Sequence, residues 1–191
     1  MSAPPFLDLP DGVRSARVRT ERAEFAVLEA GSSGPCAVFV PGWTGSKEDF
    51  VAILAPLADA GYRVVALDQK GQYETAGTAR ADDYTLPAFS TDLAQLIHEI
   101  GGPVHLVGHS FGGIVARRVA IAERDAVASL TLLGSGPGPA RADSHDLLRG
   151  MADAVRAIGL PATWAAKRAY ERSQGMAEPP PEIERFMQTR F

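Results

Sequence analysis

Ser110 is the residue whose type and surroundings point most directly to chemistry. It lies in Gly108-His109-Ser110-Phe111-Gly112-Gly113, between an apolar run at 103–107 and a helical pattern at 114–120. This order of strand, tight turn and helix presents a serine hydroxyl as a nucleophile above the end of a sheet. Glycines on both sides of the serine remove Cβ atoms that would clash in so sharp a turn. The N–H groups and positive dipole end of the following helix would stabilise an oxyanion beside the serine.

The pattern around Ser110 has two other interpretations. Any glycine-rich turn between a strand and a helix can look similar, so the pattern is a hypothesis that its context must support. A phosphate-binding loop is disfavoured, because the glycines do not follow Gly-x-Gly-x-x-Gly and no Gly-x-x-x-x-Gly-Lys-[Ser/Thr] occurs in the sequence. A nucleophilic serine is therefore favoured over nucleotide binding at this turn.

Composition and charge limit the classes of protein and partner. The 191 residues suffice for one domain with a hydrophobic core, and the net charge is −4. Without a long basic run, nucleic acid and anionic membranes are poor partners. No apolar run has membrane-spanning length, and residues 1–12 contain three prolines and no apolar segment typical of a signal peptide. We therefore expect a cytoplasmic protein, with the single cysteine, Cys36, as a buried structural thiol.

Short apolar segments alternate with helical patterns along most of the chain. Strands are predicted at 17–20, 25–28, 36–40, 63–67, 103–107 and 127–133. The first two are expected to form a hairpin at a sheet edge. The alternation from residue 36 to 133 predicts an α/β fold, a mostly parallel sheet with helices on both faces. Ligands of such sheets bind at the carboxyl ends of the strands, where the loops 41–46 and 68–84 and the turn at Ser110 should meet.

Capping residues mark two of the predicted helices. Ser46 followed by Asp49 is a variant of the capping box, and the helix after it should stop at Gly61. Thr85 should cap the helix that precedes the 103–107 strand. After residue 133 no further strand pattern follows, and apolar residues at helical spacing predict helices only.

Three motifs resemble those of the α/β-hydrolase superfamily, in particular its lid-bearing branch of esterases, lipases, haloperoxidase-like enzymes and C–C bond hydrolases. Leu106–Gly113 matches the nucleophile turn of that branch closely. Val38–Trp43 resembles its oxyanion loop, although Pro41 stands where the family usually has histidine. Asp68–Gly71 resembles its Asp-x-Arg-Gly turn, with Lys70 in place of arginine. The resemblance covers roughly residues 17–191.

The resemblance implies roles for three residues of the site. Ser110 would be the nucleophile, and the backbone N–H groups of Phe111 and Trp43 would form the oxyanion hole. Each such donor is worth about 3 kcal/mol in the transition state. Pro41 has neither an N–H group nor a ring nitrogen with which to hold the oxyanion loop. No metal and no organic cofactor are implied.

The resemblance also divides the chain into two parts. Residues 1–133 would be the N-terminal part of the hydrolase core, with about six of the usual eight strands. Residues 134–191 would be the start of an incomplete helical lid. Trp164, Met151 and Phe186 would either face the substrate or only pack the lid onto the core.

A serine nucleophile needs a base, and the family supplies it in the order serine, acid, histidine. His98 is expected to be solvated, and His105 to be a satisfied core residue. His109 should point to the opposite side from Ser110, because neighbours along a strand alternate. His145 is the one histidine in the required order, and it sits at the start of the predicted lid. No histidine in the chain is a convincing base.

No aspartate in the chain is a convincing acid of the triad either. Asp143 and Asp146 come later than the family's acid, and Asp68 is expected to brace its own turn.

The Val127–Leu133 strand would be an exposed apolar sheet edge, which invites pairing with another chain and hence self-association. The 191 residues are then either the N-terminal part of a longer hydrolase or a short form that a partner completes or that is no longer catalytic.

Two functions follow from these observations. The favoured one is a serine hydrolase that acts on a small or medium acyl ester. The alternative is a truncated or non-catalytic binding module that keeps the pocket and has lost turnover. A serine at the turn argues against haloalkane dehalogenases and epoxide hydrolases, which resemble this chain but place aspartate there.

Overall fold

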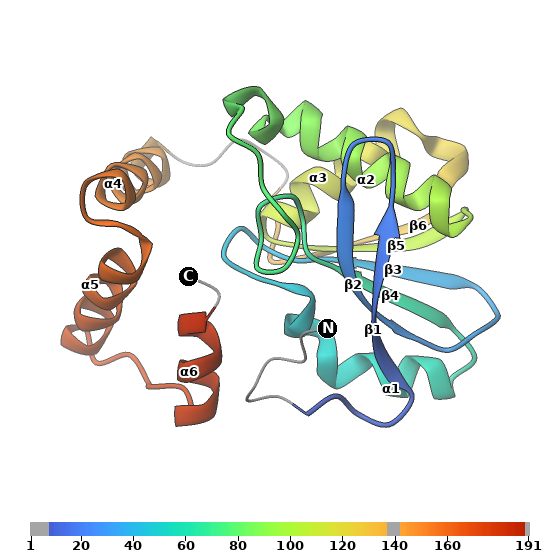
Figure 1. Ribbon diagram of the computed structural model, residues 1–191, viewed down its shortest axis with the longest axis horizontal. Coiled ribbons are helices and arrows are strands. Elements are labelled where there is room, and N and C mark those ends of the chain that lie inside the picture. The colour runs from blue at the N-terminus through green and yellow to red at the C-terminus, as the bar shows by residue number, and fades with distance from the viewer. Residues whose placement is uncertain (1–7, 137–141, 190–191) are drawn as a thin grey trace. The chain divides into compact units, whose positions relative to one another are not determined.

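The computed structural model describes residues 8–136 and 142–189, and residues Leu9–Ser135 form a compact unit around one sheet (Figure 1). The sheet has six strands in the order β1-β2-β4-β3-β5-β6. β1 and β2 form an antiparallel hairpin, β2 also runs antiparallel to β4, and the remaining neighbours are parallel. The strands are β1 (Val13–Arg19), β2 (Glu24–Ala30), β3 (Cys36–Val40), β4 (Arg63–Leu67), β5 (Val104–His109) and β6 (Val127–Leu133).

Helices cover both faces of this sheet, as the alternation of elements predicted (Figure 1). On one face α1 (Val51–Asp59) and the 3-10 turn Lys47–Phe50 bury Phe50 and Leu54 against the strands. On the other, α2 (Leu86–Ile100) and α3 (Phe111–Ala122) bury residues such as Leu96, Ile97 and Val115. The mostly parallel α/β fold predicted from the sequence is thus confirmed.

The predicted elements differ from the observed ones mainly at their ends. β1 begins well before the predicted 17–20 but ends at Arg19, and β2 extends beyond 25–28 at both ends. A hydrogen bond from Thr20 N to Ala23 O closes the turn between them. Thr85 caps α2, since its Oγ1 accepts a hydrogen bond from Ala88 N at 3.3 Å. The N–H of Ser46 donates to Asp49 Oδ2 at 3.4 Å, which supplies one half of the predicted capping box.

A second unit consists of the helices that follow residue 136. These are α4 (Ala142–Ile158), α5 (Leu160–Ser173) and α6 (Pro181–Thr189). The Arg168 guanidinium of α5 pairs with Glu184 of α6 at 3.0 Å and so ties these two helices together. No helix in residues 8–136 and 142–189 is long and apolar enough to cross a membrane.

β6 lies at the edge of the sheet, with β5 as its neighbour on one side. Most of its residues are exposed, and Leu132 and Leu133 expose 37% and 42% of their surface. An edge strand of this kind offers unpaired backbone groups and apolar side chains to a further strand.

Candidate active site

Ser110 occupies the turn between β5 and α3, in a backbone conformation that is rare for a serine. Its φ is 49° and its ψ is −117°. A non-glycine residue in such a region carries about 1–3 kcal/mol of strain and persists where its surroundings hold it. Here Ser110 N donates to Leu133 O at 2.9 Å, and Gly113 N donates to Ser110 O at 3.0 Å. Ser110 is exposed, as a nucleophile must be.

The glycines of the turn are required by close backbone contacts. A Cβ on Gly108 would lie 2.5 Å from the Cα of Gly113. A Cβ on Gly112 would lie 2.3 Å from the carbonyl oxygen of Val40 and 2.4 Å from that of Pro41. The start of α3 therefore packs directly on the end of β3 and the loop after it, at a distance that only glycine permits.

The loop 41–46 touches the turn from the other side. A Cβ on Gly42 would lie 3.1 Å from His109 Nδ1 and 3.3 Å from Ser110 Cβ. Trp43, the next residue, exposes 49% of its surface, and its N–H makes no hydrogen bond within the described residues. Phe111 begins α3, where N–H groups lack an intrahelical acceptor. The N–H groups of Trp43 and Phe111 thus belong to two segments that contact each other beside Ser110.

Two glutamines hold this loop in place, and sequence reasoning missed both. Gln69 Nε2 donates to Pro41 O at 3.0 Å. Gln72 Nε2 donates to Gly42 O at 2.7 Å and to Trp43 O at 3.1 Å. Both lie in the segment after β4, the strand beside β3. The expectation that the loops 41–46 and 68–84 meet was the signal that could have pointed to these two residues.

Lys47 lies fully buried behind the same loop, among three carboxylates. Its Nζ is 2.8 Å from Asp68 Oδ2, 2.8 Å from Glu48 Oε1 and 2.7 Å from Glu74 Oε2. The ammonium also lies 4.8 Å from the centre of the Tyr73 ring. Asp68 Oδ1 accepts from Lys47 N at 2.7 Å, and Asp68 Oδ2 accepts from Glu74 N at 3.3 Å. This carboxylate therefore holds the start of the 3-10 turn Lys47–Phe50 and the segment after β4, whereas the sequence predicted that it braces its own turn at 68–71.

Burial raises the pKa of Asp68 from 3.8 to about 6; Lys47 opposes this rise, and the nearby Glu48 carboxylate adds to it. The folded protein therefore binds a proton at Asp68 more readily than the unfolded chain does. Stability from this group is present at low pH and is lost as pH rises between about 4 and 6. The difference between a pKa of 3.8 and one of about 6 corresponds to about 3 kcal/mol of stability.

Urea unfolding of the wild type and Asp68→Asn at several pH values between 4 and 7 tests this titration. The free energy of unfolding of the wild type, relative to the variant, should fall by about 3 kcal/mol over that range. The variant serves as reference because it cannot titrate at position 68. A difference that does not change with pH would contradict the raised pKa.

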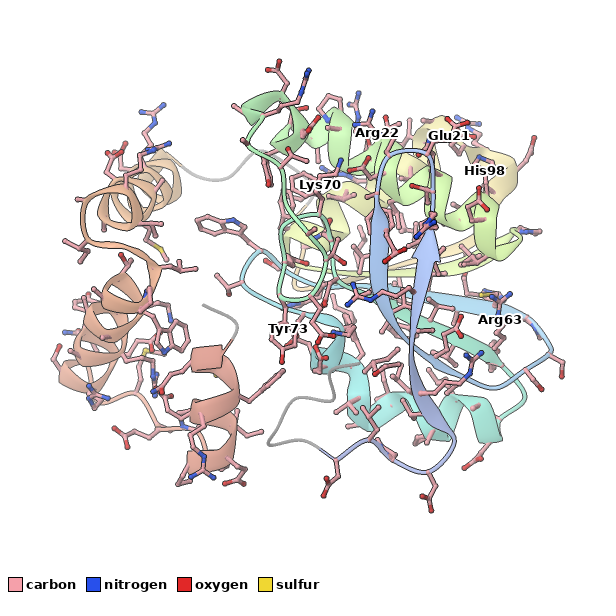
Figure 2. All side chains as sticks on the ribbon, in the orientation of Figure 1. Glu21, Arg22, Arg63, Lys70, Tyr73 and His98 are labelled. Atoms are coloured by element: carbon pink, nitrogen blue, oxygen red, sulfur yellow. The ribbon has the colours of Figure 1, made fainter. Side chains whose placement is uncertain are left out.

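Lys70, which stands where the family usually has arginine, makes an ion pair rather than facing the site. Its Nζ lies 2.7 Å from Asp92 Oδ2, and both side chains are buried. Arg22 of the hairpin turn donates from Nε to the other oxygen of Asp92 at 2.5 Å. Figure 2 shows Arg22 at the tip of the β1–β2 hairpin. The ion pair links the segment after β4 to α2 and the hairpin turn.

His98 is exposed as the sequence predicted, whereas His105 is half-buried rather than a core residue. The His98 side chain is 60% exposed, 3.7 Å from Glu123. His105 Nδ1 makes a 2.8 Å hydrogen bond with Ser129 Oγ. The side chain of His145, like that of Asp143, lies outside the described residues. Within the part of the chain that the structure describes, no hydrogen bond is made to Ser110 Oγ.

Three further residues from the sequence analysis belong to the second unit. Trp164 and Phe186 are buried, with 7% and 3% of their surface exposed, and Met151 is half-buried. Lys167 of α5 lies over the Trp164 ring, 5.0 Å from its centre. These contacts fit packing among the helices, and a role against substrate stays a prediction.

Comparisons with known proteins point to one family. A family model described as the alpha/beta hydrolase family matches residues 37–191. An sn-1-specific diacylglycerol lipase of Mus musculus is 28% identical over 78% of this chain and 48% of its own length. A non-heme haloperoxidase of Rhodococcus erythropolis is 36% identical over 55% of this chain and 38% of its own.

Solved structures share the fold. An epoxide hydrolase from an endophytic Streptomyces aligns with a TM-score of 0.65 and 27% identity, over 73% of this chain and 43% of that one. The chain spans about half the length of the curated relatives it matches.

Proposed function

Because the chain belongs to the alpha/beta hydrolase family, we propose that it is a serine hydrolase acting on small or medium acyl esters, with Ser110 as nucleophile. The observation that carries this proposal is the strained, exposed Ser110 packed against the loop of Gly42. That loop and the start of α3 supply the N–H groups of Trp43 and Phe111, which we propose as the oxyanion hole.

The proposed reaction follows from this arrangement. A base takes the Ser110 proton as Oγ attacks the ester carbonyl, and the negative charge moves to the carbonyl oxygen. The N–H groups of Trp43 and Phe111 donate hydrogen bonds to that oxygen and stabilise its charge. The C–O bond then breaks, the alcohol leaves with the proton, and water hydrolyses the acyl-enzyme. The base and its acid would lie outside the described side chains.

The relatives' names span lipase, haloperoxidase and epoxide hydrolase, so the substrate class needs a direct test. We assign esters because the turn carries serine, a nucleophile suited to acyl transfer. The protein, expressed from its complete gene, should release p-nitrophenol from acetyl to octanoyl esters and leave styrene oxide unchanged. Epoxide opening without ester hydrolysis would overturn the assignment.

The alternative of a non-catalytic binding module rests on one observation, the lack of a hydrogen bond to Ser110 Oγ within the described residues. Such a module would bind an ester without turning it over. A rise in melting temperature with a non-hydrolysed ester, and no release of p-nitrophenol, would favour it over the hydrolase.

We also propose that residues 134–191 form a lid over the site, with Trp164, Met151 and Phe186 lining the acyl pocket. A lid of this kind sets which acyl chains fit, since pockets for small molecules are lined mainly by apolar and aromatic side chains.

We also propose that the chain self-associates through the edge of β6. In the 191-residue chain the edge of β6 should pair with that of a second copy, because Leu132 and Leu133 are exposed there. Light scattering should give a dimer or larger species, and a Leu132→Lys, Leu133→Lys double variant should be monomeric. A monomeric wild-type chain would contradict this pairing.

A further inference from the structure

We propose that Gln72 is a positioning residue, whose side-chain amide aims the N–H of Trp43 at the oxyanion. The expected effect of Gln72 on catalysis rests on the proposed function, whereas the hydrogen bonds that Gln72 makes do not depend on it. Pro41 cannot hold the loop through a side chain, so the loop must be held by another group. Gln72 reaches it from the segment after the neighbouring strand, 30 residues away along the chain.

The Gln72 amide is fixed at both ends. Its Oε1 accepts a hydrogen bond from Gln69 N at 2.9 Å, which identifies the oxygen of the amide. Its Nε2 then donates to Gly42 O at 2.7 Å and Trp43 O at 3.1 Å. Both N–H bonds of the amide group are used, on two successive carbonyl groups. A side chain held in this way cannot rotate without losing a hydrogen bond.

The backbone around Gln72 is equally constrained. Gln72 N donates to Gln69 O at 2.9 Å, and Thr75 N donates to Gln72 O at 2.8 Å. Tyr73, the next residue, has a φ of 36°, in the left-handed region that non-glycine residues rarely adopt. The turn that carries Gln72 is therefore rigid enough to act as a fixed support for the loop.

Because a peptide group is planar, the support from Gln72 also fixes the direction of the Trp43 N–H. Gly42 C=O and Trp43 N–H belong to one planar trans peptide, so they point in opposite directions. A hydrogen bond that holds Gly42 O therefore also sets the direction of the Trp43 N–H. Gly45 N donates to the same oxygen at 3.1 Å and closes the turn, but it moves with the loop, whereas Gln72 does not belong to it. Gln72 thus fixes the Gly42–Trp43 peptide against the segment after β4, while Gln69 holds the carbonyl group of Pro41.

Substitution by glutamate gives a pH-dependent test. In Gln72→Glu the ionised carboxylate has no donor and places negative charge against two carbonyl oxygens, so the loop should turn away. When protonated, the new carboxyl group regains one O–H donor that can reach Gly42 O. We therefore expect Gln72→Glu to disturb the loop at pH 7 and to recover in part at acidic pH. Gln72→Met, which is similar in length and has no donor, should be disturbed at every pH.

The orientation of the Trp43 N–H is measured directly by its residual dipolar coupling in ¹⁵N-labelled protein. In Gln72→Met, and in Gln72→Glu at pH 7, this coupling should differ from wild type while that of Phe111 does not. Acid should restore it in Gln72→Glu. Gln174→Glu on the exposed end of α5 makes the same chemical change elsewhere and should leave both couplings unchanged. Trp43 couplings equal to wild type in both Gln72 variants would overturn the proposal.

Ester hydrolysis provides the second readout and separates the two proposals. In Gln72→Met kcat should fall about tenfold or more with KM within about twofold, because a misdirected donor weakens transition-state binding only. If the Trp43 coupling moves but kcat does not, the positioning role is wrong. If the wild type hydrolyses no ester while the coupling moves as expected, the proposed function fails and the structural role of Gln72 stands.

Discussion

Ser110→Ala should reduce kcat/KM for ester hydrolysis by at least about 10⁴, since the covalent step loses its nucleophile. Activity that remains would come from the oxyanion hole and substrate binding alone. The measurement is steady-state release of p-nitrophenol from the esters that the wild type accepts, with substrate well below KM.

The same variant should fold normally, which makes the loss of activity interpretable. Ser110 Oγ makes no hydrogen bond within the described residues, and alanine takes up the φ of 49° with similar strain. The free energy of unfolding should change by about 1 kcal/mol or less. Ser32→Ala, in the exposed loop between β2 and β3, is the matched control and should keep full activity. Equal activity of wild type and Ser110→Ala would show that another residue carries the reaction.

Lys47→Met should destabilise the protein by about 3–5 kcal/mol, because breaking a buried ion pair on one side leaves a charge that has lost both its water and its partner. The change removes the positive charge that Asp68, Glu48 and Glu74 share in the structure, and leaves these carboxylates without their counter-ion. Urea unfolding at pH 7 measures the difference.

A second lysine offers a close control for this prediction. Lys167 also pairs with a glutamate and also lies over an aromatic ring, but its side chain is 37% exposed. Exposed pairs contribute about 1 kcal/mol or less, so Lys167→Met should have a small effect. If both substitutions destabilise the protein equally, the buried cluster around Lys47 is not the reason for the loss.

The elements around Ser110 could be predicted because local sequence determines them. The apolar run before Ser110 and the helical spacing after it correspond to β5 and α3, and Gly108 and Gly112 are glycines for the steric reason expected. The hairpin begins earlier than predicted because Arg14 interrupts the apolar pattern; in the structure Arg14 lies on an edge strand, where its charged side chain reaches solvent.

The supports of the site could not be predicted, because they depend on which strands are neighbours. Gln69 and Gln72 lie in a polar segment without periodicity, and their contacts with residues 41–43 exist only because β4 lies beside β3. Nothing in the sequence around Lys47 shows that this one lysine will be enclosed by three carboxylates. Local patterns thus located the nucleophile turn, whereas the residues that hold its surroundings required the three-dimensional structure.

Mapping the site of covalent reaction tests the nucleophile most directly. The protein, expressed from its complete gene, is treated with a fluorophosphonate, digested and analysed by mass spectrometry at the level of peptides. A single phosphonyl adduct on Ser110 is expected, formed by displacement of fluoride by Oγ and absent from Ser110→Ala. An adduct on another residue, or none on protein that hydrolyses esters, would contradict the assignment of Ser110 as the nucleophile.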